Sequence, residues 1–388
     1  VTTSAINGTV ADNKGESLPG ATIIATHTPS GTVYSTVSRN DGRYNLPNLR
    51  IGGPYILKIS FVGFKDFMVQ NMSLTLGQDL NINAKLVESS NSLAEVVISG
   101  TDDKLFNNSR TGARETITRA QIDRLPTISR SLQDFTKLTP SANGNSFGGR
   151  SSSYNNVTVD GALFNNSFGL SGTLGGQTNS QPISLDAIEQ IQVDIAPLDV
   201  RQGFFTGAGI NTVTKSGTNS FKGSAYYFLR NPNTLGLDAG VYPVAKPVFK
   251  YYTQGLSIGG PIVKNNLFFF VSGEQERLNE PATSFTALQA GQAAGGTVSQ
   301  AQASDLTTLK DFLITKYGYN PGVFEGYNYL IQSDKLTTKL DWNINKNNTL
   351  SAKYFYLKSS RDLPASNSGA INNGSRQPSV TGMPFNGS

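Results

Sequence analysis

Alternation of apolar and polar residues in the last part of the chain is the sequence feature that most constrains its fold. Ten-residue segments at 221–230, 251–260, 267–276, 335–344 and 349–358 alternate in this way. Within 335–344 the apolar residues share one parity and the charged residues share the other: Leu336, Leu340, Trp342 and Ile344 against Lys335, Lys339 and Asp341. Such segments predict β-strands with one apolar and one polar face. The pattern is typical of a membrane β-barrel wall, and a soluble antiparallel sheet shows the same alternation.

Composition agrees with a β-rich chain and excludes several kinds of site. The 388 residues include Gly 40, Tyr 15 and Phe 21, and only 15% are charged, which indicates many strands and turns in two or three domains. There is no cysteine and a single histidine, His27, so thiolate and histidine-cluster metal sites are excluded. The net charge of +5 is spread thinly, without the Lys/Arg clusters that nucleic-acid binding needs. One histidine and no paired-carboxylate motif also argue against an enzyme, and no cofactor is expected.

The apolar runs of the chain are too short for a membrane helix or a signal peptide. The longest run, 267–271, is far shorter than the roughly 20 residues that a membrane helix needs. The first residues, VTTSAINGTV, lack the basic and apolar regions of a signal peptide. We therefore expect either a cytoplasmic protein or a mature chain whose signal has been cleaved.

Residues 1–88 predict an antiparallel β-sandwich of about seven strands. Short β-branched runs are separated by turn signals such as NKGES and RNDGR, and the stretch 55–61 alternates between two faces. Three motifs follow in order: LPGA at 18–21, DGRY at 41–44 and GF at 63–64. These motifs resemble the carboxypeptidase regulatory-like domain. The resemblance implies a transthyretin-like sandwich without catalytic residues, in which His27 is a structural residue at a strand edge.

Residues 101–217 have a different character. Two short helical patterns, with Thr118 and Ser129 as expected N-caps, precede a Gly/Ser/Asn-rich tract that is interrupted by the strand NNVTVD. This part resembles the plug domain of TonB-dependent outer-membrane transporters. The resemblance rests on four ordered motifs that include Gly149, Arg150, Asp160, Gly161, Gly207, Gly209, Asn211, Lys215 and Gly217. It implies a small α+β domain inside a barrel, where close backbone approach favours glycine.

Two interpretations of the Gly/Ser/Asn-rich tract at 141–180 stay open, a disordered linker and a set of apical plug loops that contact a ligand. In the second, Tyr154, Phe164 and Phe168 supply aromatic faces among small hydrogen-bonding residues, which suits sugars or peptides. A phosphate-binding loop ending at Lys215 is excluded, because Thr214 stands where that motif needs glycine.

The segment LAEVVISG lies in a linker, 89–100, between two polar stretches. Its position and its acidic-then-valine pattern resemble the TonB box of the same transporter family. The segment comprises Leu93, Ala94, Glu95, Val96, Val97, Ile98, Ser99 and Gly100. An extended peptide of this kind adds a strand to the exposed sheet edge of a partner, so the resemblance implies TonB as that partner. The alternative is an ordinary strand, either the last of the sandwich or the first of the plug.

Residues 218–388 predict the first strands and loops of an antiparallel transmembrane β-barrel. The stretches at 214–233 and 255–277 resemble the opening barrel strands of Oar-like transporters, a Bacteroidota-type subgroup. Short turns alternate with long connections, as in barrels with short periplasmic turns. Transporters of this family close with about 22 strands, whereas this part holds about five or six strands of the usual length. We therefore expect an N-terminal portion of a larger protein, whose open sheet edge is covered by further strands or by a partner such as a barrel-assembly machine.

The sequence as a whole predicts a mainly β protein with a transthyretin-like β-sandwich, a small α+β plug and the start of an antiparallel transmembrane β-barrel. The predicted function is TonB-dependent import of an unidentified nutrient through the outer membrane by energised displacement of the plug. The N-terminal domain and the plug are expected on the periplasmic side, and outer-membrane lipid is expected around the barrel. The alternative function is a non-transporting surface protein whose sandwich and Gly/Asn-rich loops bind a partner.

Overall fold

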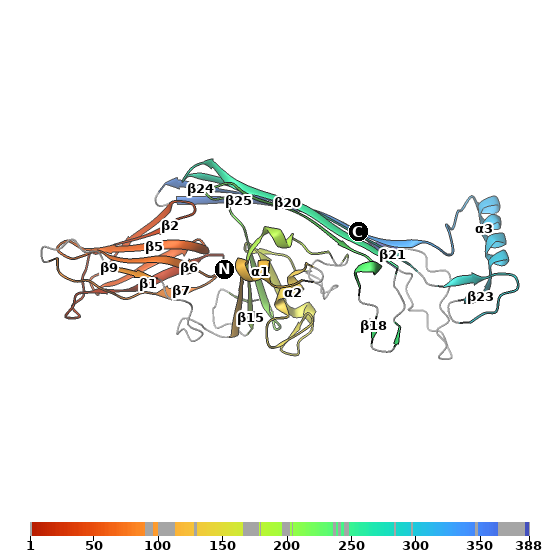
Figure 1. Ribbon diagram of the computed structural model, residues 1–388, viewed down its shortest axis with the longest axis horizontal. Helices are drawn as coiled ribbons and strands as arrows, with labels where there is room; N and C mark the ends of the chain where they lie inside the picture. Colours follow the sequence, from red (N-terminus) through yellow and green to blue (C-terminus); the bar gives the residue numbers. More distant parts are fainter. Residues whose placement is uncertain are drawn as a thin grey trace.

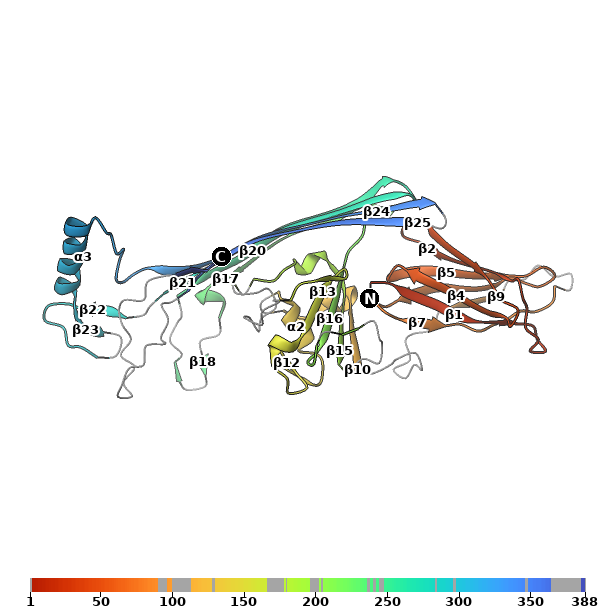
Figure 2. The ribbon, with the colours of Figure 1, turned by 180° about the vertical axis from the view of Figure 1, so that it is seen from behind.

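A computed structural model describes residues 2–89, 96–99, 113–127, 130–165, 178, 180–195, 202–203, 205–235, 238–239, 242–243, 248–282, 285–295, 298–345, 348–363 and 385–387. Three bodies follow one another along the molecule (Figure 1): a β-sandwich at one end, a smaller mixed body in the middle, and a long curved sheet that passes over both. The view from behind shows the same arch, with loops and a helix at the far end of the long sheet (Figure 2). The predicted mainly β fold class is confirmed.

The sandwich packs two sheets around one apolar core. Its strands are β1 (Ser4–Ala11), β2 (Thr22–His27), β3 (Thr32–Val37), β4 (Arg43–Leu49), β5 (Gly52–Ser60), β6 (Phe67–Leu74), β7 (Asp79–Asn81), β8 (Ala84–Lys85) and β9 (Val96–Ser99). One sheet has the order β4-β1-β7, with β8 also pairing with β1, and the other has the order β3-β2-β5-β6-β9. Alternation along β5 buries Tyr55, Leu57 and Ile59 completely, because these three side chains share the core-facing side of the strand.

The middle body, called the plug below, is a five-stranded sheet with short helices. Its elements are β10 (Ala113–Thr118), α1 (Arg119–Arg124), α2 (Leu132–Thr136), β11 (Ala142–Asn143), β12 (Ser146–Phe147), η1 (Ser152–Tyr154), β13 (Asn156–Val159), β14 (Ala162–Leu163), η2 (Leu185–Ala187), β15 (Ile188–Ile195) and β16 (Gly209–Thr214). The sheet order is β10-β15-β16-β13-β14, and β11 pairs with β12. Thr118 is the N-cap of α1, as predicted. The N-cap of α2 is Ser131, because α2 begins at Leu132; the predicted cap, Ser129, lies outside the described residues.

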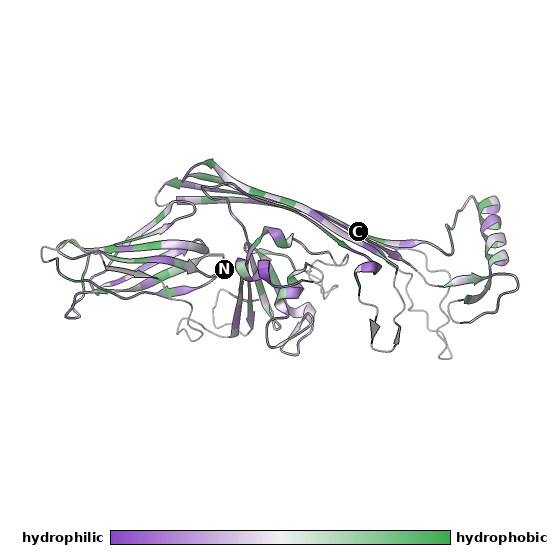
Figure 3. Cartoon of the chain, viewed as in Figure 1, coloured by the Kyte–Doolittle hydropathy of each residue, from purple (hydrophilic) through white to green (hydrophobic). Residues whose placement is uncertain are grey.

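The long curved sheet, called the wall below, consists of β17 (Lys222–Arg230), β20 (Lys250–Val263), β21 (Leu267–Pro281), β24 (Asn328–Asn345), β25 (Asn348–Leu363) and β26 (Phe385–Gly387), in this order. Neighbouring strands are antiparallel throughout. The side chains that β24 buries are polar: Ser333, Lys335, Thr337, Lys339 and Asp341. Those that it exposes on the other face include Leu336, Leu340, Trp342 and Ile344. The resulting alternation of hydropathy is visible along the wall (Figure 3) and fits a surface that meets lipid.

The two ends of the wall carry different connections. At the sandwich end β20 and β21 are joined by the turn 264–266, and β24 leads almost directly into β25. At the other end the connections are long and hold the remaining elements: η3 (Pro232–Thr234), β18 (Asp238–Ala239), β19 (Tyr242–Pro243), β22 (Thr286–Leu288), β23 (Val298–Gln302) and α3 (Ala303–Tyr317). The sandwich therefore lies at the short-turn end of the wall.

No helix among the described residues combines the length and the apolar character that crossing a membrane requires.

The polarity of the wall's outer face predicts opposite outcomes for two neighbouring substitutions. Leu340→Arg should destabilise the protein in a lipid bilayer by about 2–4 kcal/mol, because the added charge faces hydrocarbon. Thr338→Val, on the same face, should be neutral or stabilising, because it replaces a hydroxyl by a methyl group there. Urea unfolding of the protein in lipid vesicles measures both. A soluble sheet would tolerate arginine at 340, so equal stability of Leu340→Arg and the unmodified protein would contradict the membrane assignment.

Candidate functional site

The plug contacts the polar face of the wall through a hydrogen-bond network centred on Glu274 of β21. Glu274 Oε2 accepts from the hydroxyl of Ser184 at 2.8 Å and from the hydroxyl of Tyr226 at 2.6 Å. Glu274 Oε1 accepts from Lys335 Nζ at 2.7 Å, and the same ammonium lies 3.2 Å from Glu276 Oε2. Ser184 belongs to the plug and the other four residues belong to the wall. The network therefore joins the two bodies at a buried point.

Sequence reasoning missed Ser184 and Glu274 as site residues. The signal that would have found Glu274 is parity within the second half of β21, where Ser272, Glu274 and Glu276 share one side, as Lys335 shares a side with Lys339 and Asp341 in β24. In the structure these two residues are directly opposite each other in the β21–β24 pairing. Opposite charges at facing positions of neighbouring strands are the arrangement that stabilises a sheet.

A second contact between plug and wall is centred on Asp186 in η2. Ser224 of β17 donates its hydroxyl to Asp186 Oδ2 at 2.6 Å, and Lys215 Nζ lies 3.4 Å from Asp186 Oδ1. Arg119 of α1 lies 3.5 Å from the same oxygen. Burial alone would raise the pKa of Asp186, but hydrogen bonds from Ser224 and Ser257 and the two nearby cations hold it below its ordinary value. Asp186 therefore stays ionised and keeps its cations at the plug–wall boundary.

Asp160 and Gly161, two of the predicted motif residues, form a tight turn after β13. Both adopt positive φ, 49° and 86°, which glycine and aspartate tolerate better than most residues. The Asp160 carboxylate accepts from the main-chain N–H of Thr214 at 3.0 Å and lies 3.7 Å from Lys353 Nζ on the wall. This turn therefore joins two plug strands and faces the wall at the same time.

Two motif glycines allow backbones to approach closely. A Cβ atom on Gly217 would lie 2.4 Å from the carbonyl oxygen of Phe269 and 2.7 Å from that of Gly260, both on the wall. A Cβ atom on Gly207 would lie 2.2 Å from Asn155 Oδ1 within the plug. Any side chain at 217 would therefore push the chain away from the wall where the plug ends.

The other motif residues shape the plug itself. Gly149 and Arg150 lie in the turn after β12, while Gly209 and Asn211 lie in β16. Asn211 Nδ2 donates to Asp194 Oδ2 at 3.3 Å. The predicted motif residues thus do not converge on a single site.

The sandwich docks on the wall through its loops. Arg50 Nη2 lies 3.9 Å from Asp341 Oδ1, and its guanidinium lies 5.8 Å from the ring centre of Phe268. Asn343 Nδ2 donates to Thr32 Oγ1 at 3.0 Å. Asp341, Phe268 and Asn343 lie near the short-turn end of the wall, so the sandwich is held at that end.

The sandwich also docks on the plug. The main-chain N–H of Leu76 donates to Gln190 Oε1 at 2.9 Å, and Gln190 Nε2 donates to the carbonyl of Leu74 at 3.4 Å. Arg114 Nη1 donates to the carbonyl of Gly77 at 3.1 Å. One loop of the sandwich is therefore fixed to the first two strands of the plug sheet.

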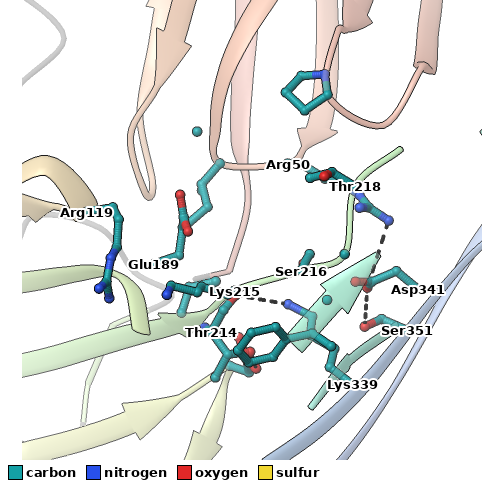
Figure 4. A pocket seen from close by; sticks show the side chains of 18 of the residues that line it. Arg50, Arg119, Glu189, Thr214, Lys215, Ser216, Thr218, Lys339, Asp341 and Ser351 are labelled. Atoms are coloured by element: carbon teal, nitrogen blue, oxygen red, sulfur yellow. Dashed lines mark hydrogen bonds and ion pairs between the residues drawn. The ribbon is translucent and has the colours of Figure 1, made fainter. Parts of the chain in front are cut away.

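A cavity of about 670 Å³ lies between the three bodies (Figure 4). Its lining includes Arg50 from the sandwich, Glu189 and Lys215 from the plug, and Lys339 and Asp341 from the wall. Burial raises the pKa of Glu189, and the attraction of Lys215 offsets this only in part. Within the described part of the chain, no group of three or more His, Cys, Asp or Glu side chains is placed to hold a metal ion. A solute in this cavity would therefore meet the charged side chains of Lys, Arg, Asp and Glu residues.

The predicted TonB-box segment forms β9, which pairs in parallel with β6 of the sandwich. Val96 lies opposite Phe67, and Ser99 lies opposite Gln70. This is the alternative placement named above, the last strand of the sandwich. Four residues of the predicted segment lie outside the described residues: Leu93, Ala94, Glu95 and Gly100. Recognition by TonB therefore stays a prediction.

The three aromatic residues predicted to contact a ligand have different surroundings. Phe164 packs edge-on against Phe355 of the wall, with ring centres 5.7 Å apart. Tyr154 is exposed in η1. Phe168 lies outside the described residues. The structure thus places Phe164 at the plug–wall boundary, and its role toward a ligand stays a prediction.

Comparison with known proteins agrees with this geometry. Residues 5–87 match the carboxypeptidase regulatory-like domain family, and residues 213–322 match the outer membrane beta barrel domain family. Over 289 residues, 69% of this chain, the sequence is 28% identical to the TonB-dependent transporter Oar of Myxococcus xanthus. The chain is homologous to TonB-dependent transporters. It spans only about a quarter of that relative, 26% of its length, and the barrel match places this part in the outer membrane.

Solved outer-membrane receptors overlap part of the structure. The siderophore receptors PirA from Acinetobacter baumannii and Pseudomonas aeruginosa give TM-scores of 0.41 and 0.42 at 17% and 15% identity. The outer membrane transporter YddB from Escherichia coli gives 0.45 at 16% identity. Each overlap covers 65% of this chain and, in the same order, 32%, 36% and 33% of the solved chain. The resemblance to TonB-dependent transporters predicted from the sequence is confirmed by the homology to Oar, and the Bacteroidota-type assignment stays a prediction.

The buried network of Glu274 predicts strong coupling between two wall residues. Lys335→Leu should lower the free energy of unfolding by about 3–5 kcal/mol, because it leaves buried carboxylates without their cation. The double variant Glu274→Leu with Lys335→Leu should recover much of that loss. Urea unfolding in detergent micelles, followed by the fluorescence of Trp342, measures both. Lys264→Leu, at an exposed turn, is the control and should change stability by no more than about 0.5 kcal/mol. Equal losses in the single and double variants would contradict the coupling.

The buried histidine predicts an acid-sensitive sandwich. Burial, and then the charge of Arg50, lower the pKa of His27 from 6.5 to about 4. Between these values the unfolded chain binds a proton that the folded chain does not, so stability falls as pH drops from 6.5 toward 4. The imidazole proton signal of this one histidine should titrate near pH 4 in the folded protein. Arg50→Gln should move the midpoint upward. A midpoint near 6.5 in the folded protein would contradict this placement of His27.

Proposed function

We propose that this chain is part of a TonB-dependent outer-membrane transporter that imports a nutrient by energised displacement of the plug. The observation that carries the proposal is the seating of a separate domain on the charged, buried face of a wall whose apolar face is exposed. A membrane barrel with a filled lumen has this arrangement. A soluble sheet would instead bury its apolar face and expose its charged face to water. The homology to Oar supports the same function.

The contacts between plug and wall suit a domain that must move. They include many hydrogen bonds and ion pairs, such as Ser184 with Glu274 and Asp186 with Ser224. The apolar part of the contact is small and comprises Phe270 and Phe355 of the wall, which pack against the plug core. Water replaces such bonds at a small net cost, whereas separating two apolar surfaces costs free energy in proportion to their area. The pair of Glu274 and Lys335 lies entirely within the wall, so it survives when the plug leaves. The wall therefore needs no rearrangement of its own for the plug to move.

A pull on the proposed TonB-binding segment would act on one strand of the plug, β10, before the others. β10 is the edge strand of the plug sheet and follows the proposed TonB-binding segment in the chain. It pairs with β15 along Ala113–Thr118, and Arg114 forms an ion pair of 2.7 Å with Asp194 there. Tension applied to the linker reaches this ladder before it reaches the plug strands that contact the wall. We infer that β10 detaches first.

The short turns at the sandwich end of the wall support a periplasmic position for the sandwich and the plug. TonB reaches the barrel from that side. Because β9 is an edge strand of the sandwich sheet, TonB either extends that sheet at the free edge of β9 or replaces β6 as its partner. In both cases TonB binding depends on main-chain hydrogen bonds of Val96–Ser99.

Strand addition predicts that the main chain of this segment matters more than its side chains. Val97→Pro should weaken binding of the purified C-terminal domain of TonB by at least about tenfold, because proline removes an N–H and disrupts the ladder. Val97→Ala keeps the N–H and should bind within about twofold of the unmodified protein. Titration calorimetry with the protein in detergent micelles gives both affinities. Unchanged affinity of Val97→Pro would remove the basis for TonB recognition at this segment.

A further inference from the structure

The cavity between sandwich, plug and wall lies behind the plug as seen from the long-loop end of the wall. Its lining includes His27 and Arg50 of the sandwich, and Arg50 contacts the short-turn end of the wall. A solute that enters from the long-loop end therefore meets this cavity only after it has passed the plug. At about 670 Å³ the cavity is within the usual size range of small-molecule sites.

Lys339 supplies a buried cation to this cavity. Its side chain is 6% exposed, and its ammonium donates one hydrogen bond, to the carbonyl of Thr214 at 3.2 Å. Figure 4 shows this bond and the position of Lys339 in the cavity lining. Among the residues that the structure describes, no carboxylate lies within ion-pairing distance of this ammonium. An ammonium has three donors, so Lys339 retains binding capacity.

Asp341 supplies a buried anion to the same cavity. It is 5% exposed; its Oδ1 accepts from the Ser351 hydroxyl at 2.8 Å, and the Ser216 hydroxyl also interacts with the carboxylate. Its Oδ2 is buried and makes no hydrogen bond of ordinary geometry among the described residues. Arg50 lies no closer than 3.9 Å to this carboxylate. Buried polar atoms normally have partners, so an unpaired oxygen beside a cavity indicates a place for a donor.

The spacing and the charge balance select the kind of solute. Lys339 and Asp341 are two residues apart on one face of β24, so their Cα atoms are about 6–7 Å apart. The cavity lining holds six Lys or Arg side chains and five Asp or Glu side chains. An inorganic anion would satisfy Lys339 but would repel Asp341 and Glu189. A solute with separate negative and positive groups can pair with Lys339 and Asp341 at the same time.

We propose that this cavity is a binding site for a zwitterionic solute, a free amino acid or a short peptide, on the periplasmic side of the plug. Lys339 receives the α-carboxylate and Asp341 receives the α-ammonium. The sandwich loop that carries Arg50 lines the site on the periplasmic side. Its place in an import route rests on the proposed function, whereas the binding itself does not.

Calorimetric titration of the full chain in detergent micelles with the dipeptide L-Ala-L-Ala tests the proposal. The unmodified protein should bind Ala-Ala at least about tenfold more tightly than N-acetyl-Ala-Ala, which lacks the ammonium, and than Ala-Ala-amide, which lacks the carboxylate. Equal affinity for the capped dipeptides, or absence of binding, would overturn the proposal. Binding of inorganic phosphate in place of the dipeptide would also overturn it, because it would identify an anion site.

Variants of the two residues give an independent readout. Lys339→Met and Asp341→Asn should each weaken Ala-Ala binding by at least about tenfold, and Lys339→Arg should restore part of the loss. Lys264→Met, at the same end of the wall but outside the cavity lining, should bind normally. The two proposals fail separately. If the unmodified protein binds Ala-Ala but not TonB, only the proposed transport role is contradicted. If it binds TonB but not Ala-Ala, only the proposed zwitterion site is contradicted.

Discussion

Along β24 the wall covers its charged side chains and exposes its apolar ones, and the way the other two bodies meet the wall depends on this reversal. A buried charge is costly unless a partner or a hydrogen bond compensates it. Lys335 pairs with Glu274 within the wall. Lys353 of the wall pairs with Asp160 of the plug, and Asp341 of the wall lies close to Arg50 of the sandwich. The plug and sandwich therefore carry polar side chains where they meet the wall. Their own apolar cores lie elsewhere, in two clusters that are largely internal to each body.

Much of the architecture follows from local sequence patterns. Alternation identified the wall strands and correctly assigned Lys335, Lys339 and Asp341 to the covered face, because strand periodicity is independent of what packs against the sheet. Turn motifs identified the sandwich, because the residues that form a tight turn are also determined locally. The limits of each strand were less accessible. β24 spans 18 residues, beyond the ten that alternate clearly, because the apolar residues Tyr329, Leu330 and Ile331 near its start fall on both faces.

The contacts between bodies were not accessible from the sequence. Ser184 and Glu274 are 90 positions apart, and Thr32 and Asn343 are 311 positions apart. Which residues meet depends on how separately folded bodies are placed, and no local pattern encodes that placement. The same applies to β9: its composition suits an added strand, but the choice of β6 as partner depends on which sheet edge is free nearby. Among the predicted glycines, another part of the chain comes close at Gly207, Gly209 and Gly217, and a positive φ is required at Gly149 and Gly161.

The pairing of β9 with β6 also has a mechanical consequence. The strand lies between the sandwich and the plug, so a pull on β9 acts first on the β6 ladder and then on the chain that leads to β10. While the ladder holds, the folded sandwich and its contacts with the wall carry the load, and the plug remains slack. Tension reaches the plug only after the ladder has opened. In the proposed transport function the sandwich therefore sets a threshold: the wall resists brief or weak pulls, and only a sustained pull moves the plug.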